Sequence, residues 1–393
     1  MNTVRMKPLL VVAFFNETAY SMMWPLATIY INQVLHKSLT VAGLALFGFA
    51  VANVIGAVVS GKLYDRFNQF WLTVIGLVLC ILSSGVGIKY DGWPTYALIL
   101  IAFGFATGWL TTGVNVYGTL VAGRSATHVF NEIYLVLNVG LVIGTICISE
   151  LFHRSIAPIF LLVTCLYCIS LMILSLYFPK QRLYYAATQR PSVQQSSSAT
   201  QPTSKLASWP LFVVSLATLV IVWTMYSQWE SNFSVYLIDN GFSTRIYSML
   251  WTLNGVVIIL VQLLIAHWPN IIHNLFDRVS WGLFFLTVSY FVTISSKSLV
   301  FIFAGMILLT IGEAIYVPSV PVIIDNWSAN EVKGRNQGLV NGFSSVGRAI
   351  GPLFGGLIID HFSFPMLFIV AGVLMLGISG LNWLVNLSYR KEE

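Results

Sequence analysis

The stretch "SLVFIFAGMILLTIGEAIYVPSVPVIID" (residues 298–325) is apolar for longer than the roughly 20 residues that a helix needs to cross a bilayer. One carboxylate, Glu313, lies near its middle. Burying a charged side chain at that depth costs free energy unless it faces water or a partner. An acid there is therefore taken by default as a candidate functional residue. The stretch therefore predicts both a membrane-spanning helix and a candidate site.

The whole chain shares this composition, since 57% of its 393 residues are hydrophobic and only 9% are charged. Such values exclude an ordinary soluble domain and predict an all-α membrane protein. Twelve spans are expected, at residues 8–32, 40–62, 69–88, 94–119, 130–152, 156–178, 209–238, 243–266, 278–296, 298–325, 336–359 and 364–387.

The twelve spans fall into two sets of six, separated by a polar segment rich in Ser, Gln, Thr and Pro. This segment cannot bury apolar surface, so it is expected to be a cytosolic linker. The predicted domains are an N-terminal bundle at 1–178, the linker at 179–208 and a C-terminal bundle at 209–393.

The distribution of Lys and Arg predicts the orientation. With the N-terminus inside, the predicted cytosolic segments hold fourteen of these residues and the outer loops hold five. Basic residues are retained on the cytoplasmic side, so both termini are expected to be cytosolic. The net charge of +6 then reflects topology and anionic headgroups, and we expect no nucleic-acid partner.

A weak internal repeat indicates that the two halves are duplicates. Segments 138–160 and 345–368 align at an offset of 207 residues. Small residues at four-residue spacing allow close helix packing. The matched residues are Gly140, Gly144 and Pro158 in the first segment and Gly347, Gly351 and Pro365 in the second.

Enzymatic and metal chemistry are not expected. The four cysteines lie within predicted spans, and the six histidines show no metal-ligand spacing. There is no phosphate-binding loop and no Ser/His/Asp cluster with catalytic spacing. We therefore expect no catalytic residue, no metal and no cofactor.

Four stretches resemble the major facilitator superfamily. They are "TIYINQVL" (28–35), "GKLYDRF" (61–67), "IGEAIYVPS" (311–319) and "GPLFGG" (351–356), and they are similar to stretches of its twelve-span drug:proton antiporters. The resemblance implies a transporter that works as a single chain in the cell membrane. It also implies a cytosolic gating motif formed by Gly61, Asp65 and Arg66.

Glu17 is expected about 13 Å into the first span and Glu313 about 21 Å into the tenth, so each half places one acid near the bilayer midplane. In transporters of this architecture the substrate site lies there, between the halves. Competition between H⁺ and a cation for one carboxylate would exchange the two without ATP. We therefore expect proton-coupled export of lipophilic or cationic small molecules.

Other residues are candidates for the same cavity. Glu230 either lines it or reaches water, and Arg348 lies at a depth similar to that of Glu313. Arg348 can clamp Glu313 in an ion pair, or it can bind an anionic metabolite in a proton-coupled importer. A membrane ligand sensor is a third possibility. Aromatic side chains that can hold a cation are Tyr20, Trp24, Trp109, Trp223, Tyr226, Trp229 and Tyr316.

Overall fold

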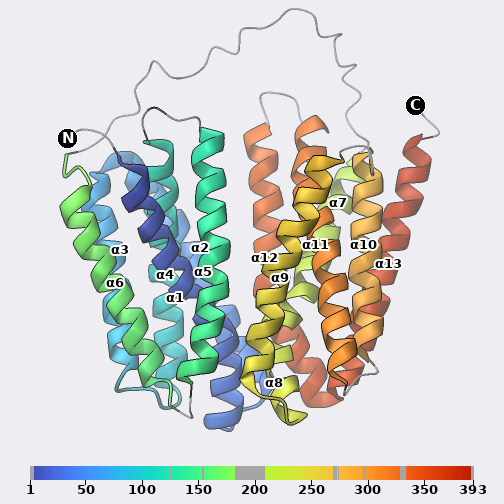
Figure 1. The fold of residues 1–393 in the computed structure, drawn as a ribbon, viewed down its shortest axis with the longest axis horizontal. Helices are drawn as coiled ribbons and strands as arrows, with labels where there is room; N and C mark the ends of the chain where they lie inside the picture. Colours follow the sequence, from blue (N-terminus) through green and yellow to red (C-terminus); the bar gives the residue numbers. More distant parts are fainter. Residues whose placement is uncertain are drawn as a thin grey trace, which may run out of the picture.

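The computed structural model describes residues 4–121, 123, 126–152, 155–181, 209–268, 272, 274–294, 298–327 and 333–390. Almost all of them are helical (Figure 1). The first half contains α1 (Met6–Ile29), the π-helical turn η1 (Tyr30–Val34), α2 (Leu39–Arg66), α3 (Gln69–Gly87), α4 (Thr95–Thr119), α5 (Ala126–Leu151) and α6 (Ala157–Tyr177). The second half contains α7 (Trp209–Glu230), α8 (Asn232–Asp239), α9 (Thr244–His267), α10 (Leu275–Ile294), α11 (Leu299–Trp327), α12 (Lys333–His361) and α13 (Phe364–Arg390).

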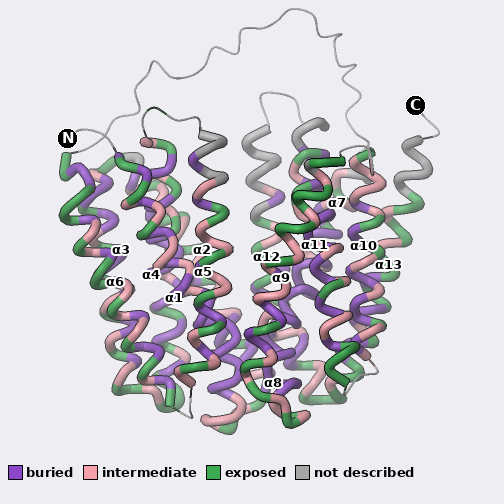
Figure 2. The backbone as a smooth tube through the Cα atoms, viewed as in Figure 1, coloured by how far each residue is buried: buried purple, intermediate pink, exposed green. Residues whose placement is uncertain are grey.

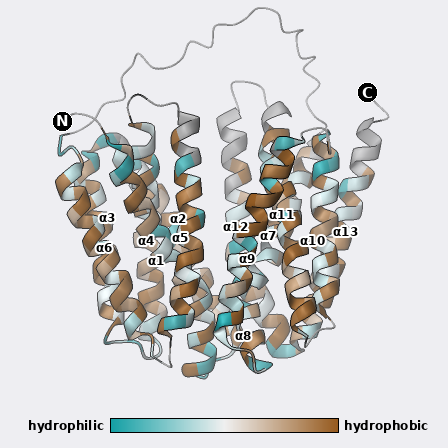
Figure 3. Cartoon of the chain, in the orientation of Figure 1, coloured by the Kyte–Doolittle hydropathy of each residue, from teal (hydrophilic) through white to brown (hydrophobic). Residues whose placement is uncertain are grey.

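The predicted all-α membrane fold is confirmed. Eleven spans within the described residues are long and apolar enough to cross a membrane, with α7 and α8 forming one of them. Helix α1 is the twelfth long helix of the arrangement, and its polar centre, Asn16 to Thr18, lowers its hydropathy. Hydrophobic residues predominate along the helices (Figure 3), as expected for helices that meet lipid.

The seventh span differs from its prediction as one continuous helix over 209–238. The structure breaks it at Ser231 into α7 and the short helix α8. Side chains around the break are polar and buried, and Ser231 Oγ donates to the backbone carbonyl of Ser227. Nδ2 of the next residue, Asn232, donates to the Pro352 carbonyl of α12 at 3.3 Å, so the break lies where buried polar groups bond to another helix.

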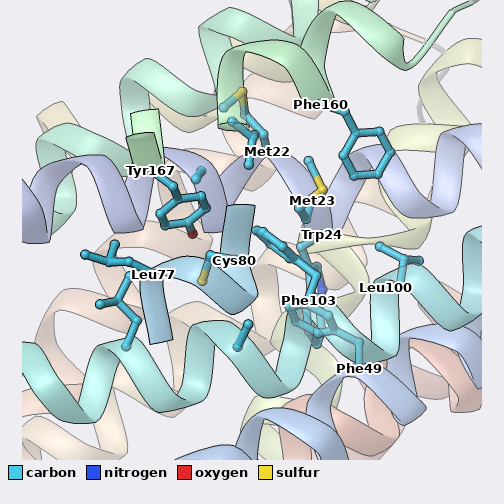
Figure 4. Close-up of a cluster of buried hydrophobic side chains, with 14 of the residues drawn as sticks. Met22, Met23, Trp24, Phe49, Leu77, Cys80, Leu100, Phe103, Phe160 and Tyr167 are labelled. Carbon is cyan, nitrogen blue, oxygen red and sulfur yellow. The ribbon is translucent and has the colours of Figure 1, made fainter. Parts of the chain in front are cut away.

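Each half has its own hydrophobic core, so the fold consists of two bundles that pack side by side (Figures 1 and 2). In the N-terminal core, Trp24 packs edge-on against Phe49, with ring centroids 5.5 Å apart, while Tyr167 and Cys80 fill the space toward α3 (Figure 4). The C-terminal core is centred on Trp229, Phe233 and Tyr290.

The helix ends define two faces of the molecule. Helices α1 and α7 begin, and α6 and α13 end, at one face, which we call the linker face (Figure 1). The predicted linker itself lies almost wholly in 182–208, outside the described residues. If both termini are cytosolic, as predicted, then the linker face is the cytosolic face. This orientation remains a prediction.

The two halves meet at the opposite face, which we call the closed face. Asp360 at the end of α12 accepts hydrogen bonds from the backbone N–H groups of Leu39 (3.1 Å) and Thr40 (2.6 Å) at the start of α2. Gln33 Nε2 donates to Asp239 Oδ1 at 2.8 Å. A carboxylate on free N–H groups at a helix start makes charge-assisted bonds, so this contact holds the halves together.

Helices α5 and α9 also cross between the halves near the closed face. Arg245 Nε lies 3.3 Å from Glu150 Oε1, and Ser248 Oγ donates to the carbonyl of Thr145 at 2.6 Å. Both contacts involve the last turns of α5 and the first turns of α9. Toward the linker face the ribbons of α5 and α12 stand further apart than at the closed face (Figure 1).

The internal repeat proposed from glycine spacing corresponds to equivalent helix contacts. A Cβ atom added at Gly140 would lie 3.1 Å from the Cβ of Glu17 on α1, and one at Gly347 would lie 2.8 Å from the Cβ of Trp223 on α7. At Gly347 the approach is too close for a Cβ atom, and at Gly140 a Cβ atom would push the facing helix back by a few tenths of an ångström. Gly144 and Gly351 are the next close contacts on the same two helix pairs.

Candidate functional site

A cavity of about 540 Å³ lies between the two bundles. Its wall combines carboxylates, one guanidinium, aromatic rings and amides from helices of both halves. The chemically distinctive lining residues are Glu17, Tyr20, Trp24, Asn53, Asn138, Trp223, Tyr226, Glu230, Tyr247, Trp251, Asn254, Glu313 and Arg348.

Glu313 on α11 is held by hydrogen bonds from two other helices. Its Oε2 atom accepts from the Tyr226 hydroxyl of α7 at 2.9 Å and from Asn254 Nδ2 of α9 at 3.0 Å. The same Asn254 nitrogen donates to Thr310 Oγ1 at 3.0 Å. Both donors contact the same oxygen, and within the described part of the chain no hydrogen bond to Oε1 is formed.

Arg348 on α12 lies over the indole ring of Trp223, with its guanidinium carbon 3.9 Å from the ring centroid. This distance is within the range of a cation–π contact. The residue is exposed to the cavity. Among the residues that the structure describes, Arg348 forms no ion pair with Glu313, so the static clamp considered above is absent from this conformation.

Glu17 comes from the first half of the protein and Glu230 from the second. Both line the cavity and are half-buried. Arg348 interacts electrostatically with Glu230 and Glu313, and also with Glu17 across the cavity. The Tyr247 hydroxyl donates to the backbone carbonyl of Glu230 at 2.8 Å, which anchors the end of α7 to α9. The cavity thus contains three carboxylates and one guanidinium within electrostatic range of one another.

Three of the aromatic residues expected at the cavity lie elsewhere. The indole N–H of Trp109 donates to the carbonyl of Leu72 at 2.8 Å, between α3 and α4. Tyr316 is buried against α10, where Gly282 allows the two helices to approach closely. Trp229 packs on Phe233, with ring centroids 4.4 Å apart. All three serve core packing in this structure.

The gating motif lies in the last turns of α2, at the linker face. Gly61 faces α4, since a Cβ added there would lie 3.8 Å from Thr112 Cγ2. Arg66 is exposed, and the side chain of Asp65 is outside the described residues. A latch between this motif and neighbouring helix ends therefore remains a prediction.

Asn254, Tyr247 and Trp251 line the cavity but were not expected from the sequence. Asn254 had a signal, because an amide side chain in the middle of the apolar span 243–266 needs a partner. Asn53 in the second span has the same signal. Its Nδ2 atom donates to the carbonyl of Gly104 and to Thr107 Oγ1, at 3.2 and 3.1 Å.

The partners of the two asparagines occupy equivalent places, while the asparagines themselves are 201 residues apart. Asn53 bonds residues 104 and 107, and Asn254 bonds residues 310 and 313, which follow 206 residues later. The stretches "TAYS" (18–21) and "TMYS" (224–227) have the same offset. Glu313 therefore corresponds to Thr107 in the first half, and Glu17 corresponds to Trp223 in the second.

Comparisons with known proteins agree with this architecture. The family model of the Major Facilitator Superfamily matches residues 9–276 and 278–392. The "Uncharacterized MFS-type transporter YttB" of Bacillus subtilis is 31% identical over 94% of this chain and 92% of its own length. The "Quinolone resistance protein NorA" of Staphylococcus aureus is 21% identical, with 86% of this chain and 85% of that protein aligned.

Solved structures show the same fold at low identity. The nucleoside transporter NupG superposes with a TM-score of 0.73 at 12% identity, covering 97% of this chain and 98% of that one. A bacterial homologue of the lysosomal transporter Spinster gives 0.75 at 12% identity, covering 99% and 97%. The chain therefore belongs to the major facilitator superfamily and is a multi-pass transporter of the cell membrane, not an enzyme.

Proposed function

We propose that this transporter is a proton-coupled exporter that exchanges H⁺ for lipophilic or cationic small molecules. The observation that carries the proposal is the position of Glu313, which lines a cavity shared by both halves and accepts both of its hydrogen bonds on one carboxylate oxygen. Relatives named "Multidrug resistance protein 2" and "Quinolone resistance protein NorA" support the export of foreign compounds.

In this proposal, protons and cations compete for the carboxyl groups of the cavity. When the cavity is open to the linker face, a cation from that side binds between Glu313 and Glu17, and a proton leaves. The closed face then opens and the linker face closes. A proton from the other side displaces the cation and resets the site. Driving force comes from the proton gradient alone, so no nucleotide is needed.

The aromatic wall suits the apolar part of such a substrate. Tyr226 lies edge-on to Trp223 and Trp251, with centroid separations of 5.2 and 6.2 Å. A cation over an aromatic face gains about 0.5–2 kcal/mol, and more when it is desolvated. Flat rings of this kind accept substrates of different shapes, since they need no directional bond.

A proton-coupled importer is the second candidate function. Arg348 is exposed to the cavity and can bind a carboxylate or phosphate group of a small metabolite. In that case the proton and substrate move in the same direction. A membrane sensor would bind a ligand and move neither.

Reconstituted vesicles separate these possibilities. The chain is placed in proteoliposomes with an imposed pH gradient and a pH-sensitive dye, and tetraphenylphosphonium is added as the probe cation. Antiport predicts proton flux opposite to cation flux. Movement of both in one direction supports the importer, and movement of neither supports the sensor; either result overturns the proposed exchange.

A further inference from the structure

A second cavity lies outside the transport path. It is a groove of about 600 Å³ at the linker face, between the first turns of α1 and the last turns of α6. It shares no lining residue with the central cavity. We call it the α1/α6 groove, and the residues that matter for its chemistry are Arg5, Lys7, Val11, Val121, Ile173 and Tyr177.

The rim of the groove is basic. Arg5 and Lys7 are both exposed, and no acidic residue lines the groove among the residues that the structure describes. The first turn of α1 contains no acid either. Two cations at the rim of one groove attract an anion.

The segment that carries these cations is held in place. Val4 pairs with Val121 in an isolated parallel β-bridge at the end of α4. Val4 and Met6 are buried, with 4% and 8% of their surfaces exposed, and they alternate with the exposed Arg5 and Lys7. The backbone is therefore anchored on one side and presents both basic residues on the other.

Below the rim the groove is apolar and open to the side. Val11 lies four residues after Lys7, about 6 Å further along the helix axis. It is 38% exposed, and Tyr177 on α6 is 50% exposed. Ile173, one turn earlier on α6, is half-buried in the same groove. The arrangement has a polar end at the membrane surface and an apolar channel that runs into the bilayer.

We propose that the α1/α6 groove binds one anionic phospholipid of the leaflet at the linker face. The phosphate group lies against Arg5 and Lys7, and an acyl chain runs along Val11 and Ile173. Basic pockets between membrane helices are a general form of anionic headgroup site. A free phosphate ion would meet the two cations but would leave the apolar channel unfilled, which favours a lipid.

The test uses the purified full chain in lipid nanodiscs of phosphatidylcholine with increasing phosphatidylglycerol. Native mass spectrometry counts retained lipid, and thermal unfolding reports stabilisation. Each basic residue near an anionic surface contributes roughly fivefold to binding. The double variant Arg5→Gln/Lys7→Gln is therefore expected to bind phosphatidylglycerol about 25-fold more weakly. The control Lys62→Gln/Lys180→Gln removes the same charge from the linker face outside the groove and should retain the lipid.

A second variant tests the apolar channel without changing charge. Val11→Trp fills the groove and is expected to lose the retained lipid, while Arg5→Lys/Lys7→Arg keeps it. Equal loss in the Lys62→Gln/Lys180→Gln control would show general surface attraction and overturn the site. Equal stabilisation by inorganic phosphate in detergent would also overturn the proposal, because it would show that the ligand is a free anion.

Discussion

The two halves of this transporter share one framework and differ in the chemistry placed on it. Gly140 and Gly347 bring α5 against α1 and α12 against α7 in the same manner. Yet the carboxylate of Glu313 stands where the first half has Thr107, and Arg348 stands where it has Leu141. The equivalent helix contacts thus frame the cavity, and residues that differ between the halves supply its charges.

The comparison also shows that Glu17 and Glu313 are not at equivalent positions of the two halves. Glu17 corresponds to Trp223, so the acid of the first half occupies the position of the ring on which Arg348 rests. Glu17 therefore faces Glu230, Glu313 and Arg348 of the second half across the cavity. A substrate between them contacts both halves, which is what a transporter that rocks about a central site requires.

The largest expected effect is the loss of coupled transport on substitution of Glu313, compared with substitution of its counterpart Thr107 in the first half. Glu313→Gln keeps the shape but cannot exchange a proton, so coupled cation transport should fall by about 100-fold or more, as for loss of an essential proton-transfer group. Thr107→Val at the equivalent position should leave coupling intact. Proteoliposome flux of both variants is the measurement, and full pH-dependent flux in Glu313→Gln would remove this residue from the mechanism.

The next effect concerns the contact between the halves. Asp360→Asn removes the charge that accepts from Leu39 and Thr40, and charge-assisted bonds contribute about 1.5–3 kcal/mol. The population with the closed face open should increase. Spin labels at Lys37→Cys and Phe362→Cys, on the two sides of the closed face, would report longer distances.

The matched control at the closed face is Asp239→Asn. Its partner Gln33 is neutral and the bond between them is exposed, so the change in distance distribution should be smaller. Identical distributions for the wild type and Asp360→Asn would show that this carboxylate does not hold the face closed.

Much of the framework was predictable from the sequence, because hydrophobic length and glycine spacing act locally. The predicted spans 69–88, 94–119 and 156–178 differ by one residue at most at each end from α3, α4 and α6. The break at Ser231 was not predicted, because it depends on buried polar contacts with α12, such as the bond from Asn232 Nδ2 to the Pro352 carbonyl.

The site was only partly predictable. Glu17, Glu230, Glu313 and Arg348 stand out because charge is rare in a span, and all four line the cavity. Aromatic residues have no such signal, since lipid, core and cavity all accept them. The direction in which each ring points depends on helix rotation, which is set by neighbouring helices.

A third prediction tests whether the glycine contacts of the two halves are equivalent. Gly144→Ala and Gly351→Ala each place a methyl group against the facing helix. Overpacking costs about 1–3 kcal/mol, so both variants should unfold at lower temperature, and by similar amounts. Gly377→Ala, which has open space around it, is the control and should not unfold earlier.

The smallest expected effect compares two tyrosines at equivalent positions. Tyr226→Phe removes one hydrogen bond to Glu313, worth about 0.5–1.5 kcal/mol, and should weaken cation binding several-fold. Tyr20→Phe should weaken it less, since the hydroxyl of Tyr20 does not contact Glu313. Fluorescence titration with tetraphenylphosphonium measures both, and an equal loss would contradict the special position of Tyr226.

Proton release on substrate binding tests the central claim most directly. Tetraphenylphosphonium is added to the detergent-purified chain in weakly buffered solution, and the pH is recorded. Competition for the carboxylates predicts that the wild type acidifies the solution as the cation binds, that its affinity rises with pH, and that Glu313→Gln releases fewer protons. Binding by the wild type with no change in pH would contradict the exchange mechanism.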